Sequence, residues 1–422
     1  MSLVLDAIYA LVAIGTAPWW MRKTRGGWPE RFGRMDPLPP PPAGKPRLLI
    51  HAVSVGETNL TRPLVDRLLH DVDLVISSTT DTGIARAREL YGSRCHVVRY
   101  PLDASWAVRR FLDAVRPDAV ALVELELWPH FLTQCRRRGI PASVINGRLS
   151  DRSFGRYRAG RMVIGKYFRQ LAFAAVQDST YAERFTTMGV APDKCHVVGS
   201  LKWDSADVTD RVAGADDLAR ELGIDRSRPL IVAGSTAPGE DELLHAATPP
   251  GVQLLCAPRR PEHFDRAAGA LPGCVRRSTR RPAPHGTDRY LLDSLGELRK
   301  AYALADVIVI GRSFGKLYGS DPMEAAALGK PVVIGPAVAN FRSVVEAMLE
   351  DDAIVQTTPD GLGGVLRGLL DDEPRRRALA DNARRCVLRH QGSTGRHASL
   401  ILSMLGLRAT SSPALQPQEV AV

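Results

Sequence analysis

The residues best placed to do chemistry lie in a glycine-rich segment at 311–324. Two β-branched runs, 307–310 and 332–334, flank it together with a helix-forming stretch at 323–328, a pattern typical of strand, loop, helix and second parallel strand. The loop at 311–321 thus follows a strand and precedes a helix. Backbone N–H groups and the helix dipole favour an anion at such a position, so this loop is predicted to hold a phosphate.

Glu324 lies in the first turn of the predicted helix. Its carboxylate would repel a phosphate, so the expected partner is a pair of neutral hydroxyls such as those of a ribose. The alternative interpretation is a glutamate that only caps its own helix.

Further polar side chains follow predicted strands in the first half of the chain. These strands are expected at 48–50, 74–76, 119–123, 142–145 and 173–176. The polar or small residues that follow the first four include Ser54, Gly56, Ser78, Thr79, Glu124, Glu126 and Arg148. Open α/β sheets bind ligands at the carboxyl ends of their strands, which makes these residues candidate ligands. Strand alternation would aim Glu124 and Glu126 to the same face.

The surrounding elements predict an α/β fold with two doubly wound, Rossmann-like domains. A second series of strands is expected at 230–233, 253–257, 307–310 and 332–334, after a polar stretch without a long apolar run. The predicted parts are an apolar segment at 1–25, a first domain at 26–205, a linker at 206–228, a second domain with terminal helices at 229–405, and a tail at 406–422. Two such domains facing an expected cleft describe the GT-B arrangement of glycosyltransferases.

Composition narrows the class of partner. The chain has 422 residues and a net charge of +10, which favours nucleic acid, an acidic membrane surface or phosphorylated small molecules. Aromatic residues make up only 6% and no nucleic-acid motif is present, which argues against nucleic acid. The six cysteines are scattered without a Cys/His cluster at ligand spacing, and the Asp-x-Asp at 71–73 precedes a strand. No metal site is therefore predicted.

The start of the chain favours a membrane surface. Residues 3–20 are apolar except for Asp6, and they end in two tryptophans ahead of a basic run at 22–25. This pattern suits a membrane interface, with the bulk of the chain on the cytoplasmic side. The stretch is short for a spanning helix, and the alternative is a first helix packed into the domain.

A series of motifs in matching order resembles the 3-deoxy-D-manno-octulosonic acid (Kdo) transferase family. The motifs are ERFG at 30–33, HAVSVGE at 51–57, STTDTG at 78–83, ELELWP at 124–129, NGRLS at 146–150, GSLKWD at 199–204, STAPGE at 235–240, PRRPEHF at 258–264 and GSDPMEAAALGKPVVIGP at 319–336. Most of these motifs are weak evidence when taken singly. Together, at the spacing of the family and over residues 1–405, they are specific for it.

The resemblance implies an inverting, metal-independent GT-B enzyme without a cofactor. Such an enzyme moves Kdo from CMP-Kdo to a lipid A precursor at the cytoplasmic face of the inner membrane. Its partners would be CMP-Kdo, that lipid and the anionic membrane surface, with no nucleic acid. CMP-Kdo has a single phosphate, which a helix N-terminus and an arginine can hold without a divalent ion.

The resemblance also implies roles for individual residues. Glu30 matches the family's proposed general base, and Glu126 is the second candidate acid. Without the resemblance, Glu30 would be a surface residue paired with Arg31 or Arg34. On the donor side the candidates are Arg259, which matches the arginine near the nucleotide, Glu324, which matches the ribose-binding acid, and Arg260, Gly311, Ser313 and Asp321. The candidate ligands of the Kdo carboxylate and of the acceptor are Ser54, Gly56, Ser78, Thr79, Arg148 and Lys202.

Three residues depart from the family pattern. Arg260 stands where the family has histidine, and Ser320 and Asp321 replace the His-Asn pair of G-H-N-P-x-E. An acid at 321 near a phosphate is unfavourable unless Arg259, Arg260 or Arg312 neutralises it. A diverged GT-B transferase or an epimerase that uses another nucleotide sugar is therefore the alternative.

Overall fold

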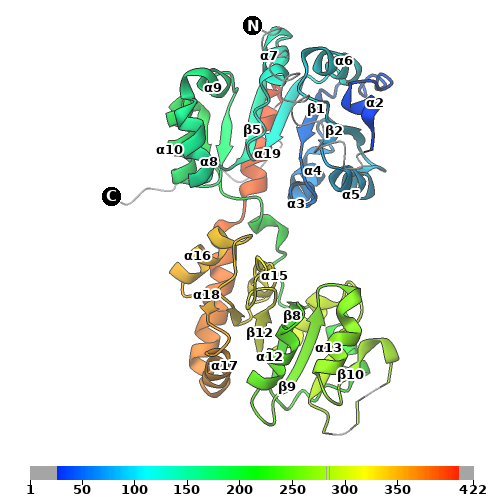
Figure 1. Ribbon diagram of the computed structural model, residues 1–422, viewed down its shortest axis with the longest axis vertical. Helices are drawn as coiled ribbons and strands as arrows, with labels where there is room; N and C mark the ends of the chain where they lie inside the picture. The colour runs from blue at the N-terminus through cyan, green and yellow to red at the C-terminus, as the bar shows by residue number, and fades with distance from the viewer. Residues whose placement is uncertain (1–25, 282, 285, 408–422) are drawn as a thin grey trace, which may run out of the picture. The chain divides into compact units, whose positions relative to one another are not determined.

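Two compact units make up the chain, and each is described by itself (Figure 1). The computed structural model describes residues 26–281, 283–284 and 286–407. Unit 1 contains the described residues up to 205 and those from 391 onward, and unit 2 contains residues 206–390.

Unit 1 is built on a parallel sheet whose described strands number seven, in the order β3-β2-β1-β4-β5-β6-β7. They are β1 (Arg47–His51), β2 (Asp73–Ser78), β3 (His96–Arg99), β4 (Ala119–Val123), β5 (Ala142–Gly147), β6 (Ala174–Val176) and β7 (Cys195–Val197). Its helices are α2 (Trp28–Arg31), α3 (Val55–Leu60), α4 (Arg62–Leu68), α5 (Asp81–Tyr91), α6 (Ser105–Val115), α7 (Pro129–Arg137), α8 (Asp151–Ala159), α9 (Arg161–Phe168), α10 (Ser179–Met188) and α19 (Ser393–Met404). Leu48 and Ile50 of β1 join one core cluster and Leu49 joins another, so helices cover both sheet faces.

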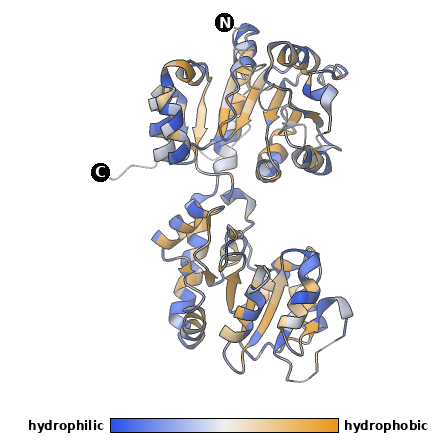
Figure 2. Ribbon diagram, viewed as in Figure 1, coloured by the Kyte–Doolittle hydropathy of each residue, from blue (hydrophilic) through white to orange (hydrophobic). Residues whose placement is uncertain are grey.

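Unit 2 repeats this design with a parallel sheet of seven described strands in the order β10-β11-β9-β8-β12-β13-β14. They are β8 (Leu230–Thr236), β9 (Gln253–Pro258), β10 (Val275–Arg276), β11 (Arg289–Leu291), β12 (Val307–Ile310), β13 (Val332–Ile334) and β14 (Val355–Gln356). Its helices are α11 (Ala215–Leu222), α12 (Glu240–Ala247), α13 (Phe264–Ala270), α14 (Leu298–Leu304), α15 (Met323–Ala327), α16 (Arg342–Glu350), α17 (Leu362–Asp371) and α18 (Glu373–His390). Within each unit the strands are largely hydrophobic and the helices present mixed surfaces (Figure 2).

The strand order reverses direction near the middle of each sheet. In unit 1 this happens between β1 and β4, and in unit 2 between β8 and β12. Open α/β sheets bind their ligands at the carboxyl ends of the strands beside this reversal. Ligand sites are therefore expected at the loops after β1 and β4 in unit 1, and at those after β8 and β12 in unit 2.

The predicted α/β class is confirmed, and every predicted strand is present. The strands that the sequence did not reveal are β3, β7, β10, β11 and β14, which have two to four residues each. Such short runs offer too little alternation or β-branched sequence to be recognised.

The C-terminal helix α19 was predicted to lie in the second domain, and this prediction is wrong. It belongs to unit 1, where His397 Nε2 accepts a hydrogen bond of 2.9 Å from the Asn146 N–H. Ile401 and Leu402 are buried in the core of that unit. The predicted linker at 206–228 also differs, because it contains the helix α11, which packs on α14 within unit 2.

A short helix, α2, lies at Trp28–Arg31, near the start of the predicted first domain. Pro29 at the second helical position and a left-handed Gly27 before it account for this turn. The predicted membrane segment at 1–25 lies outside the described residues. Among the helices that are described, none is long and apolar enough to cross a membrane.

Candidate active site

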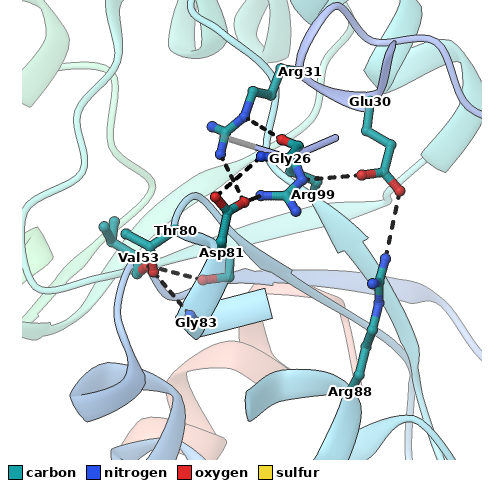
Figure 3. A network of polar contacts seen from close by, with 10 residues as sticks. Gly26, Glu30, Arg31, Val53, Thr80, Asp81, Gly83, Arg88 and Arg99 are labelled. Carbon is teal, nitrogen blue, oxygen red and sulfur yellow. Dashed lines mark hydrogen bonds and ion pairs between the residues drawn. The ribbon is translucent and has the colours of Figure 1, made fainter. Parts of the chain in front are cut away.

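Glu30 is held by two arginines at the edge of unit 1 where β2 and β3 end (Figure 3). Its Oε2 accepts a hydrogen bond of 3.1 Å from Arg99 Nε, and Oε1 lies 3.6 Å from Arg88 Nη2. The Glu30 side chain is 36% exposed, whereas Arg99 is 6% exposed. A buried guanidinium thus fixes a carboxylate that solvent or a substrate can still reach.

Asp81 shares Arg99 with Glu30 and joins α5 to α2. Its Oδ1 accepts hydrogen bonds from Arg99 at 2.7 Å and Arg31 at 3.3 Å, and its Oδ2 accepts one from the Gly26 N–H. Burial acts to raise the pKa of Asp81, but these hydrogen bonds and charges outweigh it and lower the pKa. Arg31 therefore pairs with Asp81, and the predicted pairing of Glu30 with Arg31 or Arg34 is replaced by Arg99 and Arg88.

The hydroxyl residues predicted as ligands at the ends of β1 and β2 also build their own loops. Ser54 Oγ caps α3 by accepting a hydrogen bond of 3.4 Å from the Glu57 N–H, and its hydroxyl donates one of 2.9 Å to the Glu57 carboxylate. Ser78 Oγ is buried and donates to the Val53 carbonyl at 2.9 Å. Thr79 Oγ1 lies 3.5 Å from His51 Nε2. The hydrogen bonds of Ser54 and Ser78 orient these loops, and the hydroxyl protons of both serines are used in them.

Three carboxylates meet at the strand-order reversal of unit 1. Glu57 follows β1, and Glu124 and Glu126 follow β4. Burial and the charges of Glu57 and Glu124 raise the pKa of Glu126 to about 7, opposed by a hydrogen bond from Trp128 Nε1. Burial likewise raises the pKa of Glu57. A carboxyl group with a pKa near neutrality can both take up and release a proton at physiological pH.

Strand alternation, from which Glu124 and Glu126 were expected on one face, does not apply to these two residues. Strand β4 ends at Val123, and Glu124 has a left-handed backbone with φ of 61°. The two-residue period of a strand therefore does not extend to these residues.

The remaining predicted acceptor residues lie in unit 1 as well. Arg148 is exposed directly after β5, beside the Tyr181 hydroxyl. Lys202 is partly buried after β7. Gly56 is exposed within α3, where an added Cβ would meet only Ser54 Oγ at 3.8 Å, so no close contact requires glycine there.

In unit 2, the predicted phosphate loop is occupied by a carboxylate of the protein itself. Glu240, at the start of α12, is 5% exposed. Its oxygens accept backbone N–H hydrogen bonds from Ala237 at 2.9 Å, Arg312 at 2.6 Å, Ser313 at 2.9 Å and Phe314 at 3.0 Å. The prediction that the N–H groups at 312–314 face a phosphate is therefore wrong.

Gly311 and Ser313 support this loop from within. An added Cβ at Gly311 would lie 2.6 Å from the Ser235 carbonyl oxygen, so only glycine fits. Ser313 is fully buried. Its Oγ donates a hydrogen bond of 2.6 Å to the Ile310 carbonyl and accepts one of 2.8 Å from the Gly335 N–H. Both residues shape the loop, and the Ser313 hydroxyl has no free direction for a nucleotide.

The charges of three predicted donor residues act on the buried Tyr302. Burial raises the pKa of its phenol, with contributions from the charges of Glu324 and Asp321, while Arg259 opposes them. Asp321 Oδ1 accepts a hydrogen bond of 2.8 Å from the Met323 N–H, so it caps α15. Glu324 makes no capping hydrogen bond in α15, and burial raises its pKa. Arg259, Asp321 and Glu324 thus lie within electrostatic range of the same phenol.

The two adjacent arginines after β9 differ in their surroundings. Arg260 is exposed and lies 3.3 Å from the Glu262 carboxylate. Arg259 is also exposed, and its guanidinium has no ion-pair partner within the part of the chain that the structure describes. Arg259 is therefore the cation of this pair that is available to an anionic ligand.

One group of side chains contradicts the expectation that cysteine and histidine nowhere share ligand spacing. Asp351, Cys386 and His390 bring their donor atoms within 4.8 Å of one another. Arg389 pairs with Asp351, and burial raises the pKa of Cys386 to about 12, which keeps the thiol protonated. Because metals bind the thiolate, this group fits a metal poorly.

Sequence reasoning missed several residues that organise the site: Arg99, Asp81, Glu57, Glu240 and Tyr302. The spacing of Ser54 and Glu57 is a readable capping-box signal. Arg99 ends a four-residue strand, and its pairing with Glu30 joins segments 69 positions apart, for which the sequence offers no local signal.

Comparisons with known proteins identify the family of this chain. Residues 26–205 match the family described as 3-Deoxy-D-manno-octulosonic-acid transferase (kdotransferase). The 3-deoxy-D-manno-octulosonic acid transferase of Bordetella pertussis is 32% identical over 94% of this chain and 99% of the relative, and that of Haemophilus influenzae is 31% identical over 86% and 87%.

Solved structures share the fold. Anabaena Alr3699/HepE in complex with UDP superposes with a TM-score of 0.56 at 12% identity, over 86% of this chain and all of that one. Acinetobacter baumannii MurG gives a TM-score of 0.56 at 14% identity, over 85% and 99%. Both superpositions extend over most of this chain, and the predicted GT-B fold is confirmed. The identity to the two transferases, over most of each chain, shows that this chain belongs to the 3-deoxy-D-manno-octulosonic acid transferase family.

Proposed function

We propose that this enzyme transfers Kdo from CMP-Kdo to a hydroxyl group of a lipid A precursor, a step in lipopolysaccharide synthesis. The family assignment supports a glycosyltransferase that handles Kdo. The structural observation behind the assignment of roles is the Glu30 carboxylate, which Arg99 orients at 3.1 Å while a third of its side chain stays accessible.

In the proposed reaction, Glu30 accepts the proton of the acceptor hydroxyl. The hydroxyl oxygen forms a bond to the anomeric carbon of Kdo as the bond from that carbon to the phosphate oxygen breaks. CMP leaves with the electron pair of that bond. A single displacement of this kind inverts the anomeric centre, and a base in contact with the hydroxyl contributes about 10²- to 10⁴-fold to the rate.

Glu126 is the second carboxylate proposed for the acceptor side. Its pKa of about 7 leaves it partly protonated at neutral pH. A protonated carboxyl can donate a hydrogen bond to the Kdo carboxylate, and an ionised one can accept from the acceptor hydroxyl. Arg148 and Lys202 supply positive charge for the same carboxylate or for the acceptor phosphates.

On the donor side, Arg259 is proposed to bind the phosphate of CMP-Kdo. The backbone N–H groups at 312–314 donate to Glu240, so the arginine rather than the loop supplies the countercharge. Glu324 has no capping hydrogen bond and is proposed to accept from the ribose hydroxyls. One phosphate needs only one strong cationic contact, so the proposed reaction uses no metal ion and no cofactor.

The enzyme is proposed to work at the cytoplasmic face of the inner membrane, where a water-soluble nucleotide sugar and a lipid acceptor can meet. The net charge of +10 favours an anionic bilayer as the surface. Nucleic acid is not among the proposed partners.

A second candidate is a related enzyme that uses a different nucleotide sugar. Asp321 favours this possibility, because an acid stands beside the expected donor phosphate. Incubation with CMP-Kdo and, separately, with UDP-sugars tests it. The proposal expects CMP release that depends on both CMP-Kdo and the lipid, and release of UDP, or epimerisation of a UDP-sugar, would overturn it.

A further inference from the structure

The two helices α8 and α9 of unit 1 form a surface that the proposed active site does not use. Met162, in the first turn of α9, is 96% exposed, and the adjacent Val163 is 67% exposed. Met162 is the most exposed large apolar side chain of the described residues. Single exposed apolar side chains are common, but two adjacent ones on a helix are an apolar patch that water does not favour.

The surroundings of this patch are strongly basic. Residues 151–169 contain five arginines and one lysine against the single acid Asp151. Asp151 is itself paired with Arg184. In the described structure, none of Arg152, Arg156, Arg161 and Arg169 has an ion-pair partner, and all four are exposed. The α8–α9 surface therefore presents uncompensated positive charge around an apolar centre.

Helical spacing places apolar and basic residues on one exposed face of α9. Met162, Lys166 and Arg169 are separated by four and three positions, which brings them to the same side of a helix. The opposite face carries the buried Tyr167 and Phe168, which join the core of unit 1. Figure 2 shows the hydrophobic part of α9 next to a largely hydrophilic α8.

A basic hollow adjoins this face. Its volume is about 240 Å³, and its lining includes the exposed cations Arg136, Arg169 and Lys194. Arg169 thus belongs both to the exposed face of α9 and to the hollow. A hollow lined by three cations suits a phosphate group.

We propose that the α8–α9 surface docks unit 1 on an anionic lipid bilayer, with Met162 and Val163 entering the headgroup region and the surrounding arginines binding lipid phosphates. An exposed apolar centre ringed by cations is the chemistry of an interfacial membrane contact, and the acidic headgroups complement its charge. The proposal uses no residue of the range 1–25. It stands on the exposure and charge of α8 and α9, and the proposed reaction is not needed for it.

Vesicle sedimentation with the full-length chain tests the apolar part. Vesicles of phosphatidylethanolamine with phosphatidylglycerol are compared with vesicles of phosphatidylcholine alone. We expect Met162→Ser with Val163→Ser to lower the partition coefficient for the anionic vesicles about threefold or more. Leu295→Ser, at a side chain that is 74% exposed in unit 2, is the matched control and should bind as the parent chain does.

The basic part is tested by a triple variant, Arg156→Gln, Arg161→Gln and Arg169→Gln. Each arginine near an anionic surface is worth about fivefold in partitioning, so the expected loss is large and fades as salt is added. The control removes the same charge from unit 2 with Arg220→Gln, Arg281→Gln and Arg377→Gln. Equal losses in both triple variants would show that net charge alone drives binding, and would overturn the assignment to α8 and α9.

Insertion is measured directly with Met162→Trp. The added tryptophan should emit at shorter wavelength on anionic vesicles and be quenched by brominated lipid. Unchanged emission, together with unchanged vesicle binding of the Met162→Ser, Val163→Ser variant, would contradict the proposal. Transfer to an acceptor dispersed in detergent should be unchanged in all these variants. Failure of the docking proposal is thereby distinguished from failure of the proposed reaction.

Discussion

The Glu240 carboxylate accepts a hydrogen bond of 2.9 Å from the Ser313 backbone N–H, and this contact joins the loop after β8 to the loop after β12. The same carboxylate also accepts from the N–H groups of Arg312 and Phe314. A position that backbone geometry prepares for an anion is thus filled internally. The loop after β12 is thus held by an acid of the chain itself.

Removal of this carboxylate should damage both the fold and donor binding. Glu240→Ala leaves buried N–H groups without acceptors, and we expect the free energy of unfolding to fall by about 2–4 kcal/mol. The KM for CMP-Kdo should rise more than kcat falls, because a loop without its fixed shape binds the donor less well. Denaturant unfolding and donor titration measure these changes, with Glu242→Ala on the same helix as control. If phosphate bound the loop N–H groups instead, Glu240→Ala would tighten donor binding.

Arg259 and Arg260 form a natural pair of test and control. Arg259→Ala removes the cation that has no ion-pair partner among described residues, so we expect the KM for CMP-Kdo to rise about tenfold or more. Arg260 already lies beside Glu262, and Arg260→Ala should change the KM by about twofold or less. The phosphate assignment fails if the two variants have equal donor KM values, or if Arg260→Ala has the larger effect.

Glu30→Gln should lower kcat by about 10²-fold or more, because an amide cannot take up the acceptor proton. The amide can still accept the hydrogen bond from Arg99, so the thermal midpoint should change little. Glu89→Gln is the matched control, at a side chain that is 67% exposed on α5. Turnover near the parent level in Glu30→Gln would exclude Glu30 as the base.

Glu126 predicts a specific pH dependence of stability. Its pKa rises from 4.5 to about 7 on folding, so the folded chain binds this proton more tightly than the unfolded chain between those two pH values. Stability from this group is therefore present below pH 4.5 and is lost as pH rises to about 7. The gain in unfolding free energy from Glu126→Gln should be larger at pH 8 than at pH 5. Parallel stability curves for the two proteins would show that the Glu126 pKa is not raised.

The fold could be predicted because its strongest elements are local patterns. The runs at 48–50, 119–123 and 307–310 are continuous apolar segments, which is how buried parallel strands appear in sequence. The place of α19 could not be predicted, because its contact with Asn146 joins residues 251 positions apart. Helical periodicity reveals a buried face without revealing which core receives it.

The sequence predicted which loops form the candidate site, but it did not predict the hydrogen-bond partners of the side chains in those loops. Position after a strand identified the loops of Ser78, Glu126 and Arg259. Whether a polar side chain faces a ligand or its own backbone depends on turn geometry, and Ser313 and Ser78 face the backbone. The four N–H contacts of Glu240 likewise depend on the approach of two distant loops, which no local pattern encodes.

The most direct measurement is mass spectrometry of a tetra-acyl lipid A precursor after incubation with the purified chain and CMP-Kdo. The expected result is a lipid heavier by one or more Kdo residues, with equimolar CMP released, and almost no such product from Glu30→Gln. An unmodified lipid, in the presence of folded protein that binds both substrates, would contradict the proposed transfer.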